Sequence, residues 1–189
     1  REICLPYGMK VPFDDVFILP AVGNSANASV SAARLGLSSA LLTSLGKDQH
    51  GDECLAQLTK EGISTDFVRQ EEGKKTNYHY VLWKEDDRTI LIKHEQFTPV
   101  IPDIGSPKWL YLSSLGGHTL PFHHELIEYA KNHPDINLAF QPGTFQLGFG
   151  AELAELYKIT EVVCMNKEEA EQLLDKEGAT VQELMDGLH

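Results

Sequence analysis

The sequence has little positive charge, few cysteines and no long run of apolar residues. Its 189 residues include 16 Lys and Arg against 28 Asp and Glu, which gives a formal net charge of -12. Nucleic acids and anionic membrane surfaces attract clustered Lys and Arg, so this balance argues against both as broad electrostatic partners. The negative net charge is still compatible with a small basic pocket. No apolar run is long enough to span a membrane, and no stretch reads as a signal peptide.

The three cysteines, Cys4, Cys54 and Cys164, lie far apart in the sequence. An odd and scattered count is typical of reduced thiols in a cytosolic protein. It argues against a disulfide framework, which needs paired cysteines, and against a zinc site, which needs short spacings. We therefore expect a cytoplasmic protein.

The chain is long enough to form one sizeable core. Its hydrophobic content is 42%, and its length predicts one domain over residues 1–189. The first residue is Arg1 rather than Met, and the last segment, 179–189, has the pattern of a helix that has barely ended. We therefore expect the chain to be a piece of a longer protein and the domain to be incomplete.

Strand and helix signals alternate along most of the chain. This alternation predicts an α/β fold with a parallel sheet that helices cover on both faces. The alternation of strand and helix signals is interrupted at 75–97, where two runs rich in Tyr, Val, Ile and Thr flank the polar turn at 84–87. That pattern is typical of a β-hairpin, which we place in an insertion at 74–97. The expected strands are 16–20, 38–46, 65–69, 108–115, 136–142 and 160–166, and the expected helices are 24–35, 51–63, 121–132, 150–158 and 167–178.

The segment Gly-Asn-Ser-Ala-Asn at 23–27 opens an expected helix and is the first candidate binding site. In a parallel α/β sheet, loops at the carboxyl ends of strands form the ligand site, and a helix N-terminus there offers free backbone N–H groups. Asn24 and Asn27 each carry a donor and an acceptor, which suits the neutral hydroxyl groups of a sugar. In the structural alternative, Asn24 or Ser25 only caps the helix. The segment is neither a Gly-x-Gly-x-x-Gly motif nor a P-loop.

Residues 22–51 combine a small-residue loop, an alanine-rich helix ending in Arg-Leu-Gly, a strand and a Gly-x-Asp-x-x-Gly motif. In order and spacing, this stretch resembles the first signature of the PfkB carbohydrate kinases. The resemblance implies a ribokinase-like three-layer sandwich with a mainly parallel sheet and a small β lid hairpin. It also implies substrate-binding roles for Gly23, Asn24 and Asn27, although Val22 replaces the family's first glycine. The matching residues are Gly23, Ala26, Asn27, Arg34, Leu35, Gly36, Gly46, Asp48 and Gly51.

The hairpin resembles the lid of this family, which lies over the sugar and often mediates dimer contacts. Residues two apart in a strand share a face, so Asn77, His79 and Val81 lie together. Because this face is the more polar, we expect Asn77 and His79 to bind substrate, with Lys93 as a weaker candidate. The alternative is that they are ordinary exposed strand residues. An exposed apolar face of the lid favours a homodimer. The opposite face carries Thr76, Tyr78 and Tyr80.

Asn166 and Glu169 have two interpretations. Asn followed three residues later by Glu at a helix start fits a capping box. The pair also resembles the family's Asn-x-x-Glu motif, which lies near magnesium and the phosphates. Mg²⁺ prefers oxygen ligands, and Glu169 can supply one. The two interpretations are compatible, since one side chain can cap a helix and also hold water on a metal.

The family's second signature, a Gly-Ala-Gly-Asp loop, does not occur in these 189 residues. In relatives its Asp is the catalytic base, and its amides stabilise the transferred phosphoryl group. The opening strand and the ATP-binding segments of the family are absent too. Gln141 and Gly143 replace the polar residues of the family's Asp-Pro-Asn stretch, so we assign no role to Gln141. We therefore name no catalytic residue and expect no turnover from this chain alone.

Taken together, these features predict ATP-dependent phosphorylation of a sugar or nucleoside hydroxyl by the parent protein, with Mg²⁺ as cofactor. The alternative is a non-catalytic sugar-binding or assembly module. A Rossmann-like nucleotide-binding protein is disfavoured, because the first βα turn lacks the glycine fingerprint. His123 and His124 are adjacent, so they point apart on a helix and predict no metal site. The sequence leaves the identity of the substrate open.

Overall fold

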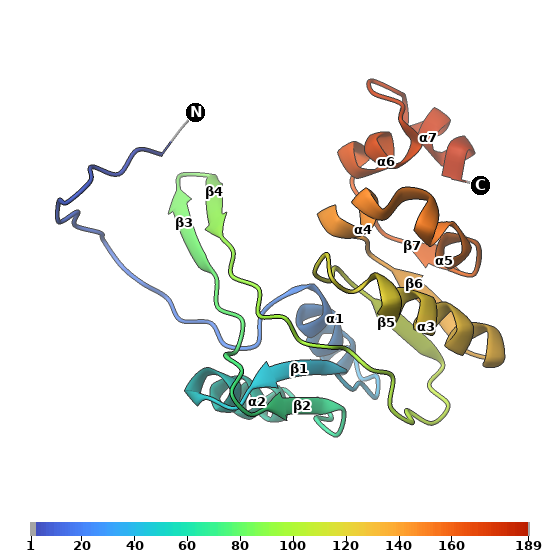
Figure 1. Cartoon of the computed structure of the whole chain (residues 1–189), viewed down its shortest axis with the longest axis horizontal. Coiled ribbons are helices and arrows are strands. Elements are labelled where there is room, and N and C mark those ends of the chain that lie inside the picture. The colour runs from blue at the N-terminus through green and yellow to red at the C-terminus, as the bar shows by residue number, and fades with distance from the viewer. Residues whose placement is uncertain (1–2, 189) are drawn as a thin grey trace.

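The structure, a computed structural model, describes residues 3–188, so the outermost positions of the predicted domain, 1–2 and 189, lie outside the described residues. Its first unit is a parallel strand pair with two helices (Figure 1). Helix α1 (Asn24–Arg34) is followed by Gly36, whose φ of 87° is the left-handed geometry that often terminates a helix. Strand β1 (Thr43–Gly46) pairs with β2 (Val68–Glu71), and α2 (Gln49–Lys60) connects them. A small core holds this unit together: Ala26, Leu41, Leu58 and Ile63.

The predicted hairpin is present. Strands β3 (Tyr80–Lys84) and β4 (Asp87–Leu91) are antiparallel and project away from both parallel sheets in Figure 1. Glu85 in the turn has a φ of 57°, a left-handed conformation typical of tight hairpin turns. All five residues of β4 are exposed. The hairpin is therefore positioned by contacts at its base.

The second unit is a parallel sheet with strand order β5-β6-β7 and helices packed against it. Phe140, Leu153 and Leu156 are fully buried in its core. Leu126 and Ile127 of the first helix in this unit pack onto the same cluster. The elements are β5 (Trp109–Leu112), α3 (Leu120–Asn132), β6 (Asn137–Phe140), α4 (Thr144–Phe149), η1 (Gly150–Leu153), α5 (Ala154–Lys158), β7 (Val162–Val163), α6 (Lys167–Leu174) and α7 (Val181–Leu188).

The α/β class and the hairpin are as predicted, but several elements differ from the expectation. The parallel strands form two sheets rather than one, and no strand within 3–188 joins them. The expected strand at 16–20 does not form: the segment pairs with no strand among the described residues, and positions 16–19 are exposed. Helix α4 was missed, because six residues with an internal glycine are too short for a helical pattern.

None of the helices within the described part of the chain has the length and hydrophobicity needed to cross a membrane.

Candidate functional site

The start of α1 meets the carboxyl ends of β5 and β6. The Asn24 side-chain amide donates to Ser114 Oγ at 3.5 Å, across 90 positions of sequence. Gly143, which precedes α4, lies directly behind Ser114: a Cβ atom on Gly143 would come within 2.4 Å of Ser114 Cβ. Ligand sites of parallel α/β folds form at this edge, where strands end and helices begin. These three residues therefore mark the floor of the candidate site.

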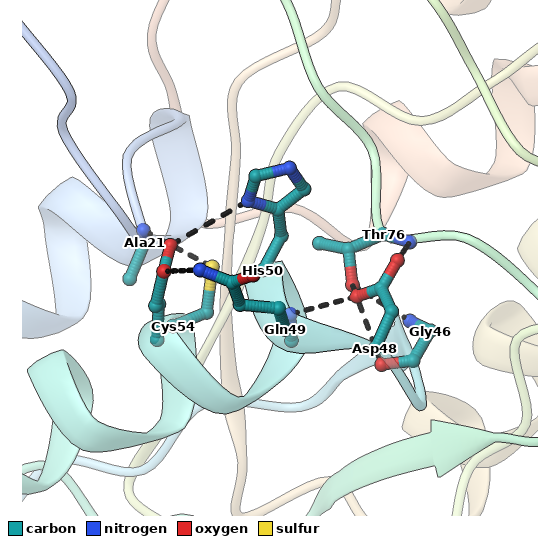
Figure 2. A network of polar contacts seen from close by, with 9 residues as sticks. Ala21, Gly46, Asp48, Gln49, His50, Cys54 and Thr76 are labelled. Atoms are coloured by element: carbon teal, nitrogen blue, oxygen red, sulfur yellow. Dashed lines mark hydrogen bonds and ion pairs between the residues drawn. The ribbon is translucent and has the colours of Figure 1, made fainter.

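The loop that leads into α1 is held by α2. Ala21 has a φ of 56°, an uncommon conformation for a residue with a side chain, and its N–H donates to Cys54 Sγ at 3.3 Å (Figure 2). Gly23 follows with a φ of 139°. Burial raises the pKa of the Cys54 thiol, which favours the neutral form. The thiol thus serves as a structural acceptor that fixes the path of the loop to Asn24.

A buried hydrogen-bond network fixes the loops after β5 and β6. Gln146, which is 1% exposed, accepts from Gly143 N at 3.1 Å and donates to Ser113 O at 3.3 Å. His123 Nδ1 lies 2.8 Å from Thr119 O, and its Nε2 lies 3.5 Å from the Gln146 amide nitrogen. Burial lowers the pKa of His123, which favours a neutral ring that donates through Nδ1 and accepts through Nε2. His123 is therefore a structural residue of this network.

Aromatic rings connect the hairpin to the same edge of the sheet. His79 and His94 have ring centroids 5.5 Å apart, and His94 lies 6.2 Å from the ring of Phe145 in an edge-to-face arrangement. Phe145 in turn contacts Gly117, where a Cβ atom would lie 3.1 Å from its ring. All three rings keep exposed surface. They therefore form an aromatic wall beside the loop after β5, which carries Gly117.

His94 should make this wall sensitive to pH. Partial burial, and then the neighbouring His79 and His118, lower the pKa of His94 below its ordinary value of 6.5. The neutral ring is thus favoured in the fold, so its contribution to stability is complete above about pH 6.5 and is lost as the pH falls through the lower folded pKa.

We expect an NMR titration of the His94 ring to give a midpoint below 6.5, and the His94–Phe145 contact to weaken at acidic pH. The variant His94→Gln, which cannot titrate, should lose this pH dependence. A midpoint at or above 6.5 would contradict the assigned environment.

Of the other two hairpin candidates, Asn77 lies at the base of the hairpin and Lys93 lies on another surface. Asn77 Oδ1 accepts from Glu95 N at 2.6 Å and so joins the two segments at the base of the hairpin. Its NH₂ group remains available as a donor. Lys93 lines a different hollow of about 420 Å³, together with Tyr78 and Tyr80. The structure thus groups His79 with His94 and Phe145, and leaves Lys93 on another surface.

Asn27 lies on the first turn of α1 and is exposed. It lines a hollow of about 290 Å³ between α1, α2 and the segment 20–22, which also includes Arg34 and Glu61. Arg34 and Glu61 form a bidentate ion pair there, with distances of 2.7 and 2.8 Å. Although Asn24 and Asn27 are close in sequence, Asn24 contacts the loop after β5 whereas Asn27 lines this hollow.

Asn166 and Glu169 form the predicted capping box at the start of α6. Glu169 N donates to Asn166 Oδ1 at 2.8 Å, and Asn166 N donates to Glu169 Oε2 at 2.9 Å. Both follow β7, so they lie at the same edge of the sheet as Ser114 and Gly143. Burial and the nearby Glu169 raise the pKa of Tyr157 to about 12, so its hydroxyl keeps its proton.

Glu169 offers a Mg²⁺ ion a single carboxylate ligand. Within residues 3–188, no group of three or more His, Cys, Asp and Glu side chains is placed to bind a metal. Mg²⁺ usually keeps several waters and is held by one or two carboxylates with nucleotide phosphates. The second oxygen of Glu169 is compatible with that role while the first caps the helix.

Sequence reasoning did not find Ser114, His94 or Phe145. Ser114 follows a strand and so lies at an expected ligand edge, which was the available signal. His94 lies beyond the end of β4, one position after Lys93, and only Lys93 was a candidate in that segment. Phe145 belongs to the helix that was missed. Gln141, to which no role was assigned, hydrogen-bonds the Tyr111 hydroxyl beside the same edge.

A sequence model of the family described as pfkB family carbohydrate kinase matches residues 20–189. That range contains both the small-residue loop at 23–27 and the Asn-x-x-Glu pair at 166–169. Among curated proteins, an uncharacterized sugar kinase of Archaeoglobus fulgidus is 25% identical over 163 residues, which cover 80% of this chain and 63% of that protein.

Two solved structures are similar in fold. A fructokinase from Vibrio cholerae O395, in fructose, ADP and calcium ion bound form, has a TM-score of 0.70 at 19% identity and matches 88% of this chain and 58% of its own. A ribokinase from Giardia lamblia has a TM-score of 0.69 at 19% identity and matches 86% of this chain and 53% of its own. These similarities confirm the ribokinase-like α/β fold. This chain spans between about half and two thirds of the length of these relatives.

Proposed function

Since the chain belongs to the pfkB family of carbohydrate kinases, we propose that the complete protein transfers a phosphoryl group from ATP to a hydroxyl group of a sugar or nucleoside. The observation that carries this proposal is the contact between Asn24 and Ser114, which brings the small-residue loop to the carboxyl edge of the sheet. The site there is rich in neutral hydrogen-bonding groups and has aromatic walls, which suits a polyol better than a charged ligand.

In this proposal the substrate lies between the floor and the hairpin. Gly23 permits close approach of the backbone, and the side chains of Asn24 and Asn27 bind hydroxyl groups. Asn77 and His79 bind the substrate from the hairpin, with His94 and Phe145 beside them. Enclosure by the hairpin excludes water from the reacting hydroxyl, which protects ATP from hydrolysis.

The phosphate side of the site would use Asn166 and Glu169. Their position after β7 supports binding of nucleotide phosphates and of Mg²⁺ through water, and the bound cation would neutralise charge on the transferred group. We assign the catalytic base and the anion hole to no residue of this chain and expect no sustained turnover from it alone. A non-catalytic sugar-binding or assembly module is the second candidate.

We further propose a cytoplasmic homodimer that associates through the hairpin. Several large apolar side chains of the hairpin are exposed, which is typical of a surface that a partner covers. Trp83 is 63% exposed and Ile92 is 61% exposed. Neither nucleic acid nor a membrane surface is proposed as a partner, because the chain carries a net charge of -12.

A thermal-shift screen against sugars, nucleosides, Mg-ATP and NAD tests the proposal. A ligand at about 100-fold excess over its Kd should stabilise the protein by about 2.7 kcal/mol. We expect a shift with one sugar or nucleoside that is lost in Asn24→Ala and in Asn27→Ala. The matched control is Asn132→Ala, because Asn132 lies at the far end of α3. A shift with NAD, or with Mg-ATP alone, would overturn the proposal.

A further inference from the structure

The carboxylate of Asp48 joins the start of α2 to the base of the hairpin. We propose that Asp48 and Thr76 are positioning residues that fix the base of the hairpin beside the candidate site. Only the expected effect on ligand affinity rests on the proposed function. The geometric part of the proposal stands on the contacts themselves.

Three hydrogen bonds converge on Asp48 (Figure 2). Thr76 donates twice, from its N–H to Oδ2 at 2.9 Å and from its hydroxyl to Oδ1 at 2.7 Å. Gly51 N donates to Oδ1 at 2.9 Å, which caps α2. The Thr76 hydroxyl also accepts from Gly46 N at 3.0 Å. One carboxylate therefore serves a helix cap and a contact 28 positions away.

The glycines around Asp48 permit this close approach. A Cβ atom on Gly46 would lie 2.4 Å from Thr76 N, and one on Gly51 would lie 2.1 Å from Gly46 O. Both are contacts with backbone atoms, which cannot rotate away. The Gly-x-Asp-x-x-Gly motif at 46–51 is therefore shaped to receive the segment 74–76, in addition to starting a helix.

The contacts continue from Thr76 to the wall of the site. Lys74 Nζ donates to Gln96 O at 2.9 Å, and Asn77 Oδ1 accepts from Glu95 N at 2.6 Å. These bonds tie the outgoing segment of the hairpin to its return segment. The return segment carries His94, which packs on Phe145. Asp48 thus acts on the site through the hairpin and does not touch the floor at Ser114.

A helix cap alone would not need this arrangement. Ser, Thr or Asn caps a helix as well as Asp does, and one acceptor suffices for Gly51. The charge of Asp48 instead strengthens the bonds from Thr76, because hydrogen bonds to an ionised acceptor are about twice as strong as neutral ones. Burial alone would raise the pKa of Asp48, but the bonds from Thr76 and Gly51 outweigh it and the pKa lies below its ordinary value. The carboxylate is therefore charged at neutral pH, and Thr76, at 5% exposure, is shielded from competing water.

The test is a set of NMR contacts between rings, measured on the whole chain. The His94–Phe145 cross-peak reports the position of the hairpin over the sheet, and the His79–His94 cross-peak reports the hairpin itself. The Phe140–Tyr157 cross-peak, from rings 5.4 Å apart, reports the core. We expect Thr76→Val to lose the first cross-peak and keep the other two. Retention of all three would overturn the proposal.

Two further variants separate positioning from folding. Thr76→Ser keeps the hydroxyl and should restore the His94–Phe145 cross-peak. Asp48→Asn keeps an oxygen for Gly51 N, but its NH₂ group faces the Thr76 N–H, so we expect loss of the same cross-peak with the cap intact. Thr89→Val on β4 is the matched control, since Thr89 is exposed and faces Leu82 within the hairpin. If Thr76→Val does not fold, the outcome with Asp48→Asn decides.

Ligand affinity provides the second readout. For the sugar or nucleoside that binds the wild-type chain, we expect Thr76→Val to raise Kd about tenfold, a typical effect of losing one charged hydrogen bond, and Thr76→Ser to restore it. Unchanged affinity with a lost cross-peak would show that the hairpin does not contribute to binding and would overturn the positioning role. If no sugar or nucleoside binds the wild-type chain, the proposed function fails, and the cross-peaks still decide whether Asp48 positions the hairpin.

Discussion

Alanine at position 46 is expected to lower the free energy of unfolding by about 3 kcal/mol or more, the upper range for overpacking of a buried position. Gly46 is the buried last residue of β1. A Cβ atom there would lie 2.4 Å from Thr76 N and 2.5 Å from Lys74 O. Because Asp48 holds Thr76 in place, either β1 or the base of the hairpin must shift. Urea denaturation of the wild type and of Gly46→Ala measures the loss.

Gly148→Ala is the matched control for this substitution. Gly148 lies in α4, where an added Cβ atom would meet open space, and it does not need a left-handed backbone. Alanine there should be neutral or stabilise the protein by up to about 1 kcal/mol, because it reduces the entropy of the unfolded chain. Equal midpoints for Gly46→Ala and the wild type would show that the segment 74–76 does not pack against β1 as described.

The sequence predicted the order of the helices and the hairpin better than the extent of the strands. Helices such as α2 are amphipathic and carry local signals, here acidic residues in the first turn and Gly62 after the end, so their positions can be predicted closely without knowledge of partners: the helix expected at 51–63 is observed at Gln49–Lys60. A strand exists only where another strand pairs with it. The expected strand at 38–46 shrinks to Thr43–Gly46, because β2 pairs only with those four residues. The expected strand at 16–20 has no partner at all among the described residues.

The floor of the candidate site could be predicted in part, and its walls could not. The position of Asn24 follows from the rule that ligands bind at the carboxyl edge of parallel strands, and its contact with Ser114 agrees with that rule. His94 and Phe145 are distant in the sequence and meet only because the segment after β4 passes beside α4. No local pattern encodes such a contact, since it depends on the angle of the hairpin. The same limit applies to Asp48, which the sequence identified as a signature residue without revealing Thr76 as its partner.

The second large effect is expected for Gln146→Leu, which should lower the free energy of unfolding by about 2–4 kcal/mol. Leucine has a similar volume, so the loss comes from hydrogen bonding rather than from a cavity. Gln146 is buried, and its removal leaves Gly143 N and Ser113 O without their partner, at about 1–3 kcal/mol for each buried group. Urea denaturation measures this difference. Gln182→Leu on the exposed face of α7 is the control, and a change within about 0.5 kcal/mol is expected there.

The same substitution should also weaken ligand binding, because Gln146 connects the two loops that form the floor. Ser113 precedes Ser114, which contacts Asn24, and Gly143 packs behind Ser114. Without Gln146, the loops after β5 and β6 are not fixed relative to each other. The position of Ser114, which accepts from the Asn24 amide, is then no longer held. A Gln146→Leu protein that remains folded in the cold should therefore show a smaller thermal shift with the sugar or nucleoside than the control does. If its stability falls while its ligand affinity equals that of the control, the network supports the fold only, and the floor is held by Asn24 and Ser114 without it.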